Sequence, residues 1–202
     1  MIGIVLKEMP LGEADKLLKV FSREEGLITV VAKGAKKSGS RFLAAASVFA
    51  YSDMELVKGK SMYVLKNAKL IESFYGLRED LDVLTAAAEL GKITLKVIQE
   101  DLQDEETLRL LLKGLHFLEQ RKRRPSLIKA VFAIRLLWIQ GMISSIERMN
   151  PGEASRLKPG TKAAYDYICT AEEDKLFAFK LSEEVEQELC NHADSLCKTI
   201  LG

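Results

Sequence analysis

The sequence predicts an α+β fold, in which a small N-terminal β-barrel is followed by an all-helical domain. Residues 1–75 contain short apolar runs separated by turn residues, a pattern typical of β-strands. Residues 77–202 carry apolar residues at the 3.6-residue spacing of amphipathic helices. A chain of 202 residues suits one large domain or two small ones, so we expect two domains, 1–76 and 77–202.

Five strands are predicted in the first part, at residues 2–7, 16–22, 27–33, 51–58 and 62–71. Turns are expected at 9–12 and 59–61, and the connection that ends in Gly26 predicts a hairpin. The alanine-rich segment 42–50 indicates a short helix. Five strands with one helical insert after the third are typical of an OB-type barrel, but an SH3-like barrel has almost the same pattern.

Five helices are predicted in the second part, at residues 77–102, 104–118, 125–139, 160–168 and 182–201. The acids at 104–106 and the pair Ser182 and Glu183 are typical of helix starts. Pro125 occupies a favoured first-turn position, and residues 127–139 are apolar nearly all round, which predicts the most buried helix. The polar segment 147–158 predicts a loop.

The charge balance excludes a uniformly basic nucleic-acid coat, because 30 basic residues face 29 acidic ones and the net charge is +1. Residues 33–41 are nevertheless locally basic, with four cations and no acid. Their glycines have the GxxxxG spacing of a P-loop, but Ser40 and Arg41 follow where that motif needs Lys-Ser/Thr. The segment therefore predicts a phosphate-gripping loop, or else a merely solvated one.

Metal binding and catalysis find little support in the sequence. Cys190 and Cys197 are seven residues apart on a predicted helix, about 10 Å along its axis, and Cys169 lies on another segment. The two histidines, His116 and His192, fall in helical patterns, and no GxSxG or HExxH motif occurs. We expect no metal, no cofactor and no enzymatic activity.

The compartment predicted from the sequence is the cytoplasm. Three cysteines make no disulfide framework, which is typical of a reducing environment. Charged Lys7 and Glu8 come too early for a signal peptide, and the charge-free stretches fall short of the roughly 20 apolar residues that a membrane span needs.

Residues 12–42 resemble the N-terminal domain of the RecO family of bacterial recombination mediators. The features that carry the resemblance are Gly12-Glu13 with Asp15, Phe21 at the end of a strand, Glu25-Gly26, Ala32-Lys33-Gly34 and Ser40-Arg41. The resemblance implies an OB-fold followed by a helical domain, and a nucleoid-associated protein of the bacterial cytoplasm. It also implies binding of single- and double-stranded DNA, and strand annealing. The implied partners are RecR and single-stranded DNA-binding protein (SSB), and through them RecA.

The family's DNA contacts lie on the OB-fold, so the resemblance implies DNA-binding roles for Lys33, Lys36, Lys37 and Arg41. Many RecO-like proteins carry a four-cysteine zinc module after a helix that ends at a glycine, here Gly141. Residues 142–158 contain no cysteine and are too few for that module, so we expect it to be absent.

The family's SSB partner has a short acidic tail that ends in apolar residues, and a receptor for it needs an apolar pocket ringed by positive charge. The basic run 121–124 and the third predicted helix could supply both, or could be solvated charge and core. The residues expected to take part are Arg121, Arg123, Arg124 and Arg135, beside Leu127, Val131, Phe132, Leu136 and Trp138. Two other functions stay open: an adaptor that docks RecR-like or SSB-like proteins with incidental DNA contact, and an enzyme with an unrecognised site.

Overall fold

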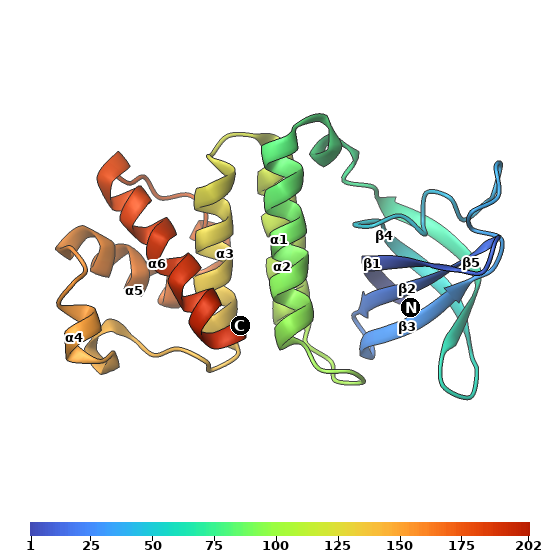
Figure 1. Cartoon of the computed structure of the whole chain (residues 1–202), viewed down its shortest axis with the longest axis horizontal. Coiled ribbons are helices and arrows are strands. Elements are labelled where there is room, and N and C mark those ends of the chain that lie inside the picture. Colours follow the sequence, from blue (N-terminus) through green and yellow to red (C-terminus); the bar gives the residue numbers. More distant parts are fainter. The chain divides into compact units, whose positions relative to one another are not determined.

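The computed structural model describes residues 1–202, apart from the side chains of Pro151 and Glu153. The residues group into two compact units. The barrel unit contains residues 1–75 and 98–108, and the helical unit contains residues 76–97 and 109–202 (Figure 1). The predicted division at residue 76 does not anticipate that residues 98–108 group with the barrel.

The barrel unit is a closed five-stranded barrel with the strand order β1-β2-β3-β5-β4. Its strands are β1 (Ile2–Leu11), β2 (Asp15–Ser22), β3 (Gly26–Ala32), β4 (Tyr51–Lys58) and β5 (Tyr63–Glu72). β3 and β5 pair in parallel through two residues each, and the other neighbours are antiparallel. The predicted OB-type barrel followed by helices is confirmed.

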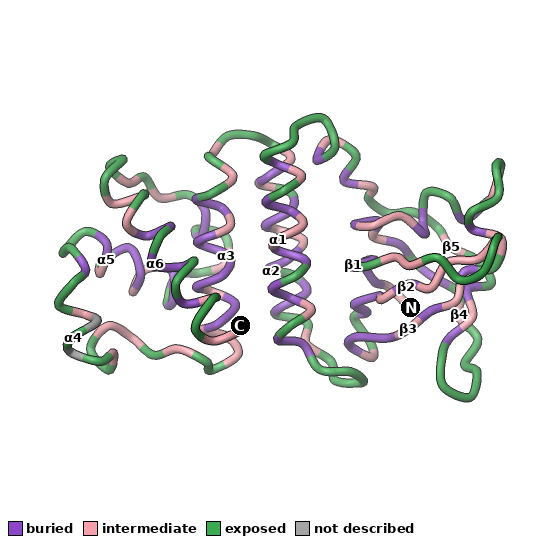
Figure 2. The backbone as a smooth tube through the Cα atoms, viewed as in Figure 1, coloured by how far each residue is buried: buried purple, intermediate pink, exposed green. Residues whose placement is uncertain are grey.

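Alternate side chains along the strands point inward and fill the barrel interior. On β2, Leu18 and Val20 are buried inside while Lys19 between them points outward, as the two-residue period of a strand requires. Figure 2 shows buried stretches, in purple, along the strands of the barrel. Ala35, Phe42 and Ala46, which follow β3 in the chain, join the same hydrophobic core. The segment after β3 is therefore packed onto the barrel.

The strand β1 is longer than predicted, because it continues through residues 9–11 and the chain turns only at Gly12, whose φ is 59°. Pro10 lies within this strand opposite Lys16 of β2. β1 pairs with β4 only up to Ile4, so Pro10 lies on a stretch with one open edge. Proline is tolerated there because the strand has no second ladder for it to interrupt.

The predicted helix at 42–50 is wrong: the segment is a series of turns. Phe49 has a φ of 69°, which a helix does not allow. The Phe49 N–H donates to the carbonyl of Val5 at 2.7 Å, and the Val5 N–H donates to the carbonyl of Ala50 at 3.1 Å. These bonds to β1 replace the helical hydrogen bonds of the segment's end.

The helical unit is built around one nearly all-apolar helix. The helices are α1 (Leu81–Val97), α2 (Glu105–Gln120), α3 (Pro125–Ile139), α4 (Pro151–Ala154), α5 (Pro159–Thr170) and α6 (Glu183–Leu201). Helix α3 packs on α1, α5 and α6, and nine of its residues are buried, as predicted.

The predicted helix starts at Pro125 and Ser182 are confirmed, and the Ser182 hydroxyl accepts a hydrogen bond from the N–H of Val185 at 3.4 Å. Helix α1 is shorter than residues 77–102. It begins after Asp80, whose carboxylate accepts from the N–H of Val83 at 3.0 Å, and it ends at Val97. The expected loop 147–158 contains part of a 3₁₀ turn, Ile146–Arg148, and the single-turn helix α4. Among the described helices, none combines the length and apolarity that a bilayer crossing requires.

Candidate nucleic-acid interface

The candidate interface is built from the loop after β3, residues 33–42, and from the start of β5. Gly34 and Gly39 turn the loop with φ values of 68° and 76°, a region that glycine enters without steric cost. The Asp15 carboxylate accepts from the Gly34 N–H at 2.7 Å, and the Lys36 N–H donates to the carbonyl of Ala14 at 2.9 Å. The loop is thereby tied to the turn between β1 and β2.

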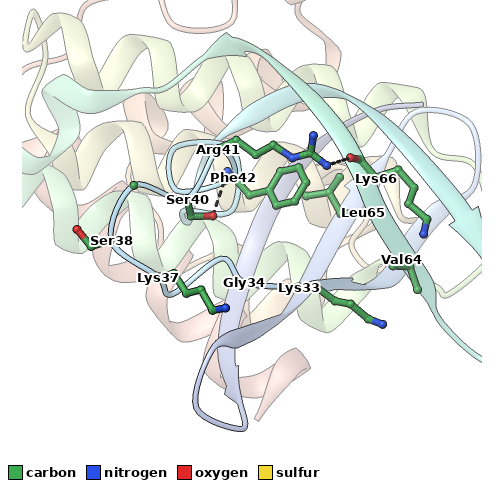
Figure 3. Close-up of a pocket in the computed structure, with 11 residues that line it drawn as sticks. Lys33, Gly34, Lys37, Ser38, Ser40, Arg41, Phe42, Val64, Leu65 and Lys66 are labelled. Carbon is green, nitrogen blue, oxygen red and sulfur yellow. Dashed lines mark hydrogen bonds between the residues drawn. The ribbon is translucent and has the colours of Figure 1, made fainter.

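A pocket of about 490 Å³ lies between this loop and β5. We call it the cationic pocket. Four exposed cationic side chains line it, and its lining contains no carboxylate. The cations are Lys33, Lys37, Arg41 and Lys66, as Figure 3 shows. Backbone and hydroxyl groups of residues 38–40 complete the loop side of the pocket.

Arg41 is held in a defined position at one wall of the pocket. Its Nη2 donates to the carbonyl of Lys66 at 2.7 Å, and its guanidinium lies 4.6 Å from the ring centroid of Phe42 (Figure 3). The ring itself is buried in the barrel core. A guanidinium has five N–H donors, so one bond to a carbonyl leaves others to face a phosphate.

Sequence reasoning placed four cations in one loop, and the structure brings three of them around the pocket: Lys33, Lys37 and Arg41. Lys36 does not line it, because its ammonium donates to the carbonyl of Gly12 at 3.1 Å. The structure adds Lys66, which sequence reasoning missed. The alternation of β5, with Tyr63 and Leu65 buried, could have indicated that Lys66 is exposed, but not which loop it meets.

Several other cations of the barrel are paired with acids, unlike the cations of the pocket. Lys16 pairs with Glu8 at 2.9 Å, and Lys58 lies 4.0 Å from Glu25. Within the described part of the chain, none of the four cations of the pocket has a carboxylate at ion-pair distance. Their positive charge is therefore available to an external anion.

The barrel aromatics contribute little exposed ring surface. Phe21, Phe42, Phe49, Tyr63 and Phe74 are all buried. Tyr75 is 66% exposed, but it does not line the cationic pocket. The pocket is therefore suited to contacts with the phosphate backbone rather than to base stacking.

The arginines expected to bind a partner are each engaged within the helical unit. Arg121 donates to the carbonyl of Gly76 and pairs with Glu79 at 2.9 Å. Arg124 pairs with Glu183 at 3.0 Å. Arg123 donates to the carbonyl of Ala178 at 3.3 Å, and Arg135 to that of Ile168 at 3.2 Å.

The prediction of an apolar docking pocket on the third helix is wrong. Leu127, Val131, Phe132 and Leu136 are all buried in the helical core, where α3 meets α1, α5 and α6, and only Trp138 of the predicted apolar set is partly exposed. Side chains with no exposed surface cannot form a docking pocket. The neighbouring helices cover most of this nearly all-apolar helix, so these side chains offer little apolar surface to a ligand.

A pocket with the expected chemistry lies elsewhere in the helical unit, between α1, α3 and α6. It has a volume of about 280 Å³ and we call it the helical pocket. Its apolar lining includes Ile93 and Leu201, and its cations are Lys92, Lys96, Lys129 and Lys198. Two of these lysines pair with acids of the lining, Lys92 with Glu89 at 2.7 Å and Lys129 with Asp194 at 2.8 Å.

The cysteines show no metal-ligating arrangement. Burial raises the pKa of the Cys169 thiol to about 12, and the nearby Asp166 adds to the shift. Burial also raises the pKa of Cys190 and of Cys197. The described residues contain no group of three His, Cys, Asp or Glu side chains that could hold a metal ion.

Comparison with known proteins points to one family. A family model described as "Recombination protein O N terminal" matches residues 1–74. The chain is 35% identical over 214 residues to the DNA repair protein RecO of Acetivibrio thermocellus, covering 93% of this chain and 85% of that protein. It is 32% identical over 173 residues to the RecO of Rubrobacter xylanophilus, covering 83% of this chain and 68% of that protein.

Proposed function

This chain belongs to the RecO family of DNA repair proteins, and from that premise we propose that it is a DNA-binding recombination mediator that anneals complementary strands. With RecR, it would help load RecA onto SSB-coated single-stranded DNA. The observation that carries the DNA-binding part is the cationic pocket, where four uncompensated cations surround a cavity without a carboxylate.

The proposed mechanism is electrostatic and independent of sequence. Lysines and an arginine that grip phosphate oxygens hold a strand by its backbone and release counterions. Bases that are not stacked on the protein stay free to pair with a second strand, which is what annealing requires. Lys36, outside the pocket, is proposed to contribute at its margin. We expect annealing to proceed without ATP.

A second candidate function is an adaptor that docks RecR-like or SSB-like proteins with only incidental DNA contact. The helical pocket supports a docking role, because apolar lining beside lysines suits an acidic peptide with apolar residues. The two functions differ in one measurable respect: an adaptor binds partners when its DNA affinity is negligible.

The decisive experiment measures annealing of complementary oligonucleotides and affinity for single strands over a range of salt concentrations. The variant Lys33→Gln/Lys37→Gln/Lys66→Gln should bind all sequences more weakly. Because each phosphate contact contributes about 0.7 to the log–log salt slope on single strands, the slope should fall by about 2.

The matched control is Lys122→Gln/Lys175→Gln/Lys180→Gln, three exposed lysines of the helical unit with the same change of net charge. The control should keep both slope and annealing rate. Equal losses in the two variants would mean that only net charge matters, and a wild-type protein that binds partners but not DNA would favour the adaptor.

A further inference from the structure

The connection between α1 and α2 is strongly acidic and lies against the barrel. Residues 100–106 contain five acids and no base, and we call this segment the acidic connection. By its contacts the whole segment belongs to the barrel unit, and not to the helical unit. It carries more negative charge than any comparable stretch of the barrel strands.

Backbone contacts seat the acidic connection at the start of β3. Glu100 forms a parallel β-bridge with Leu27, and the Gln103 amide donates to the carbonyl of Glu24. Gly26 leaves room for the segment: a Cβ there would lie 2.0 Å from the carbonyl oxygen of Leu102. The placement therefore rests on close backbone packing as well as on charge.

The acids of this segment pair with cations of β2 and of the turn that follows it. The Lys19 ammonium donates to Glu100 at 2.7 Å, and the Arg23 guanidinium lies 3.1 Å from Glu105. The hydrogen bond from Lys19 lowers the pKa of the Glu100 carboxyl, so this acid stays ionised. Glu100 and Asp101 also line a cavity of about 200 Å³ with Lys58 and Lys60 of the β4–β5 hairpin.

The outer face of the barrel connects this region to the cationic pocket. Leu17, Val31 and Val64 are in register across β2, β3 and β5, and Val64 lines the pocket. Two residues further along β2, on the same outward face, Lys19 is in register with Thr29. The β2–β3 face and the β4–β5 loop are where OB-folds bind oligonucleotides.

We propose that the acidic connection masks a second DNA-contact surface, formed by Lys19 and Arg23, by occupying these cations with Glu100 and Glu105. A strand held in the cationic pocket is thereby kept from extending along the β2–β3 face. This inference rests on the proposed DNA binding. It adds that Glu100 and Glu105 compete with the phosphate backbone for Lys19 and Arg23. Neutralising the two acids would extend the site by two cationic contacts.

The test is the variant Glu100→Gln/Glu105→Gln, assayed for single-strand affinity between 50 and 200 mM salt. Two new phosphate contacts should steepen the log–log slope by about 1.4, so the affinity gain over wild type should shrink about sevenfold across this range. The control Glu55→Gln/Glu89→Gln makes the same change of net charge and also removes one ion pair, Glu89–Lys92. An equal slope in the variant and the control would overturn the proposal.

Two further variants separate masking from simpler explanations. Adding Lys19→Gln/Arg23→Gln to the double variant should return affinity and slope to the wild-type values. Lys19→Gln/Glu100→Gln removes the cation together with the acid that neutralises it, so it leaves net charge unchanged and should keep the wild-type salt slope. A fall of about 0.7 in the slope of this charge-neutral variant would show that Lys19 contacts DNA directly and that Glu100 does not mask it.

Failure of the inference is distinguishable from failure of the proposed function. If wild-type protein binds no DNA, or if the pocket variant loses nothing, the proposed function fails. If the pocket variant loses affinity while Glu100→Gln/Glu105→Gln behaves as its control, only the masking proposal fails. Thermal unfolding of each variant shows whether the barrel is intact.

Discussion

Gly26 is the residue on which the seating of the acidic connection depends most directly. Its φ is 67°, a left-handed conformation that side chains with a Cβ adopt at a cost. The carbonyl of Leu102 occupies the space that a Cβ would need. Backbone conformation and close packing therefore both require glycine at this position.

We predict that Gly26→Ala destabilises the barrel more than Gly12→Ala does. Gly12 also has a positive φ, of 59°, but nothing lies within 4 Å of the position of a Cβ there. Gly12→Ala should thus carry only the conformational cost of about 1–2 kcal/mol. Gly26→Ala carries a similar conformational cost and must also displace residues 100–105.

Urea unfolding of the two variants measures this difference in the free energy of unfolding. An equal loss of stability would show that the acidic connection can be displaced from the barrel without a further loss in the free energy of unfolding. In that case, Gly26→Ala should also weaken the Lys19–Glu100 and Arg23–Glu105 pairs, and its DNA affinity should rise as in Glu100→Gln/Glu105→Gln.

At the scale of elements, helix α3 determines where the helical unit has room for a ligand. Its apolar side chains are covered by α1, α5 and α6, so docking must use grooves between neighbouring helices. The helical pocket is such a groove. Arg124, in contrast, is bound to two acids of α6, Glu183 and Glu186, and its guanidinium is partly occupied.

We predict that an acidic peptide with an apolar C-terminus binds at the helical pocket. Lys129→Gln/Lys198→Gln should weaken binding of a labelled peptide of this kind, because both lysines line the groove. Arg121→Gln/Arg124→Gln, with the same charge change, tests the surface predicted from the sequence. Fluorescence anisotropy gives both affinities. A loss of affinity confined to the arginine variant would place the peptide-binding site at the basic run 121–124 instead.

The net charge of the whole molecule is close to zero, but the extent to which cations are paired with acids differs from one region to another. Cations on β2 and β4 face acids, whereas the cationic pocket has none in its lining. The opposite charges of an ion pair largely cancel each other's field, and salt screens exposed charges over about 10 Å at 0.1 M, so a nearby strand responds mainly to unpaired cations. The pocket can therefore attract DNA although the net charge of the chain is only +1.

We predict that folding needs no metal. The described residues hold no cluster of potential metal ligands, and the raised pKa of Cys169, about 12, keeps its thiol protonated. Excess EDTA should leave the thermal unfolding midpoint unchanged within about 1 °C, whereas loss of a structural zinc usually unfolds a small domain. A large downward shift, together with stoichiometric zinc by elemental analysis, would contradict the prediction.

Features that depend on neighbouring residues could be predicted from the sequence. The strand at 16–22, the helix starts at Pro125 and Ser182, and the cationic loop 33–41 were predicted from local patterns, and the structure contains each of them. Local patterns failed at 42–50, where alanine favours a helix but hydrogen bonds to Val5 hold the backbone in turns. Tertiary hydrogen bonds there outweigh intrinsic helix propensity.

Which cations are paired with acids and which are not depends on contacts between residues far apart in the chain. Lys19 and Glu100 are 81 residues apart in the chain, and Arg41 and the carbonyl of Lys66 are 25 apart. Charge compensation acts through space over a few ångströms, and no periodicity in the sequence encodes such distances. Two cation-bearing stretches of one chain can thus become a compensated surface and an open pocket. Packing brings distant acids to one stretch and leaves the other without them.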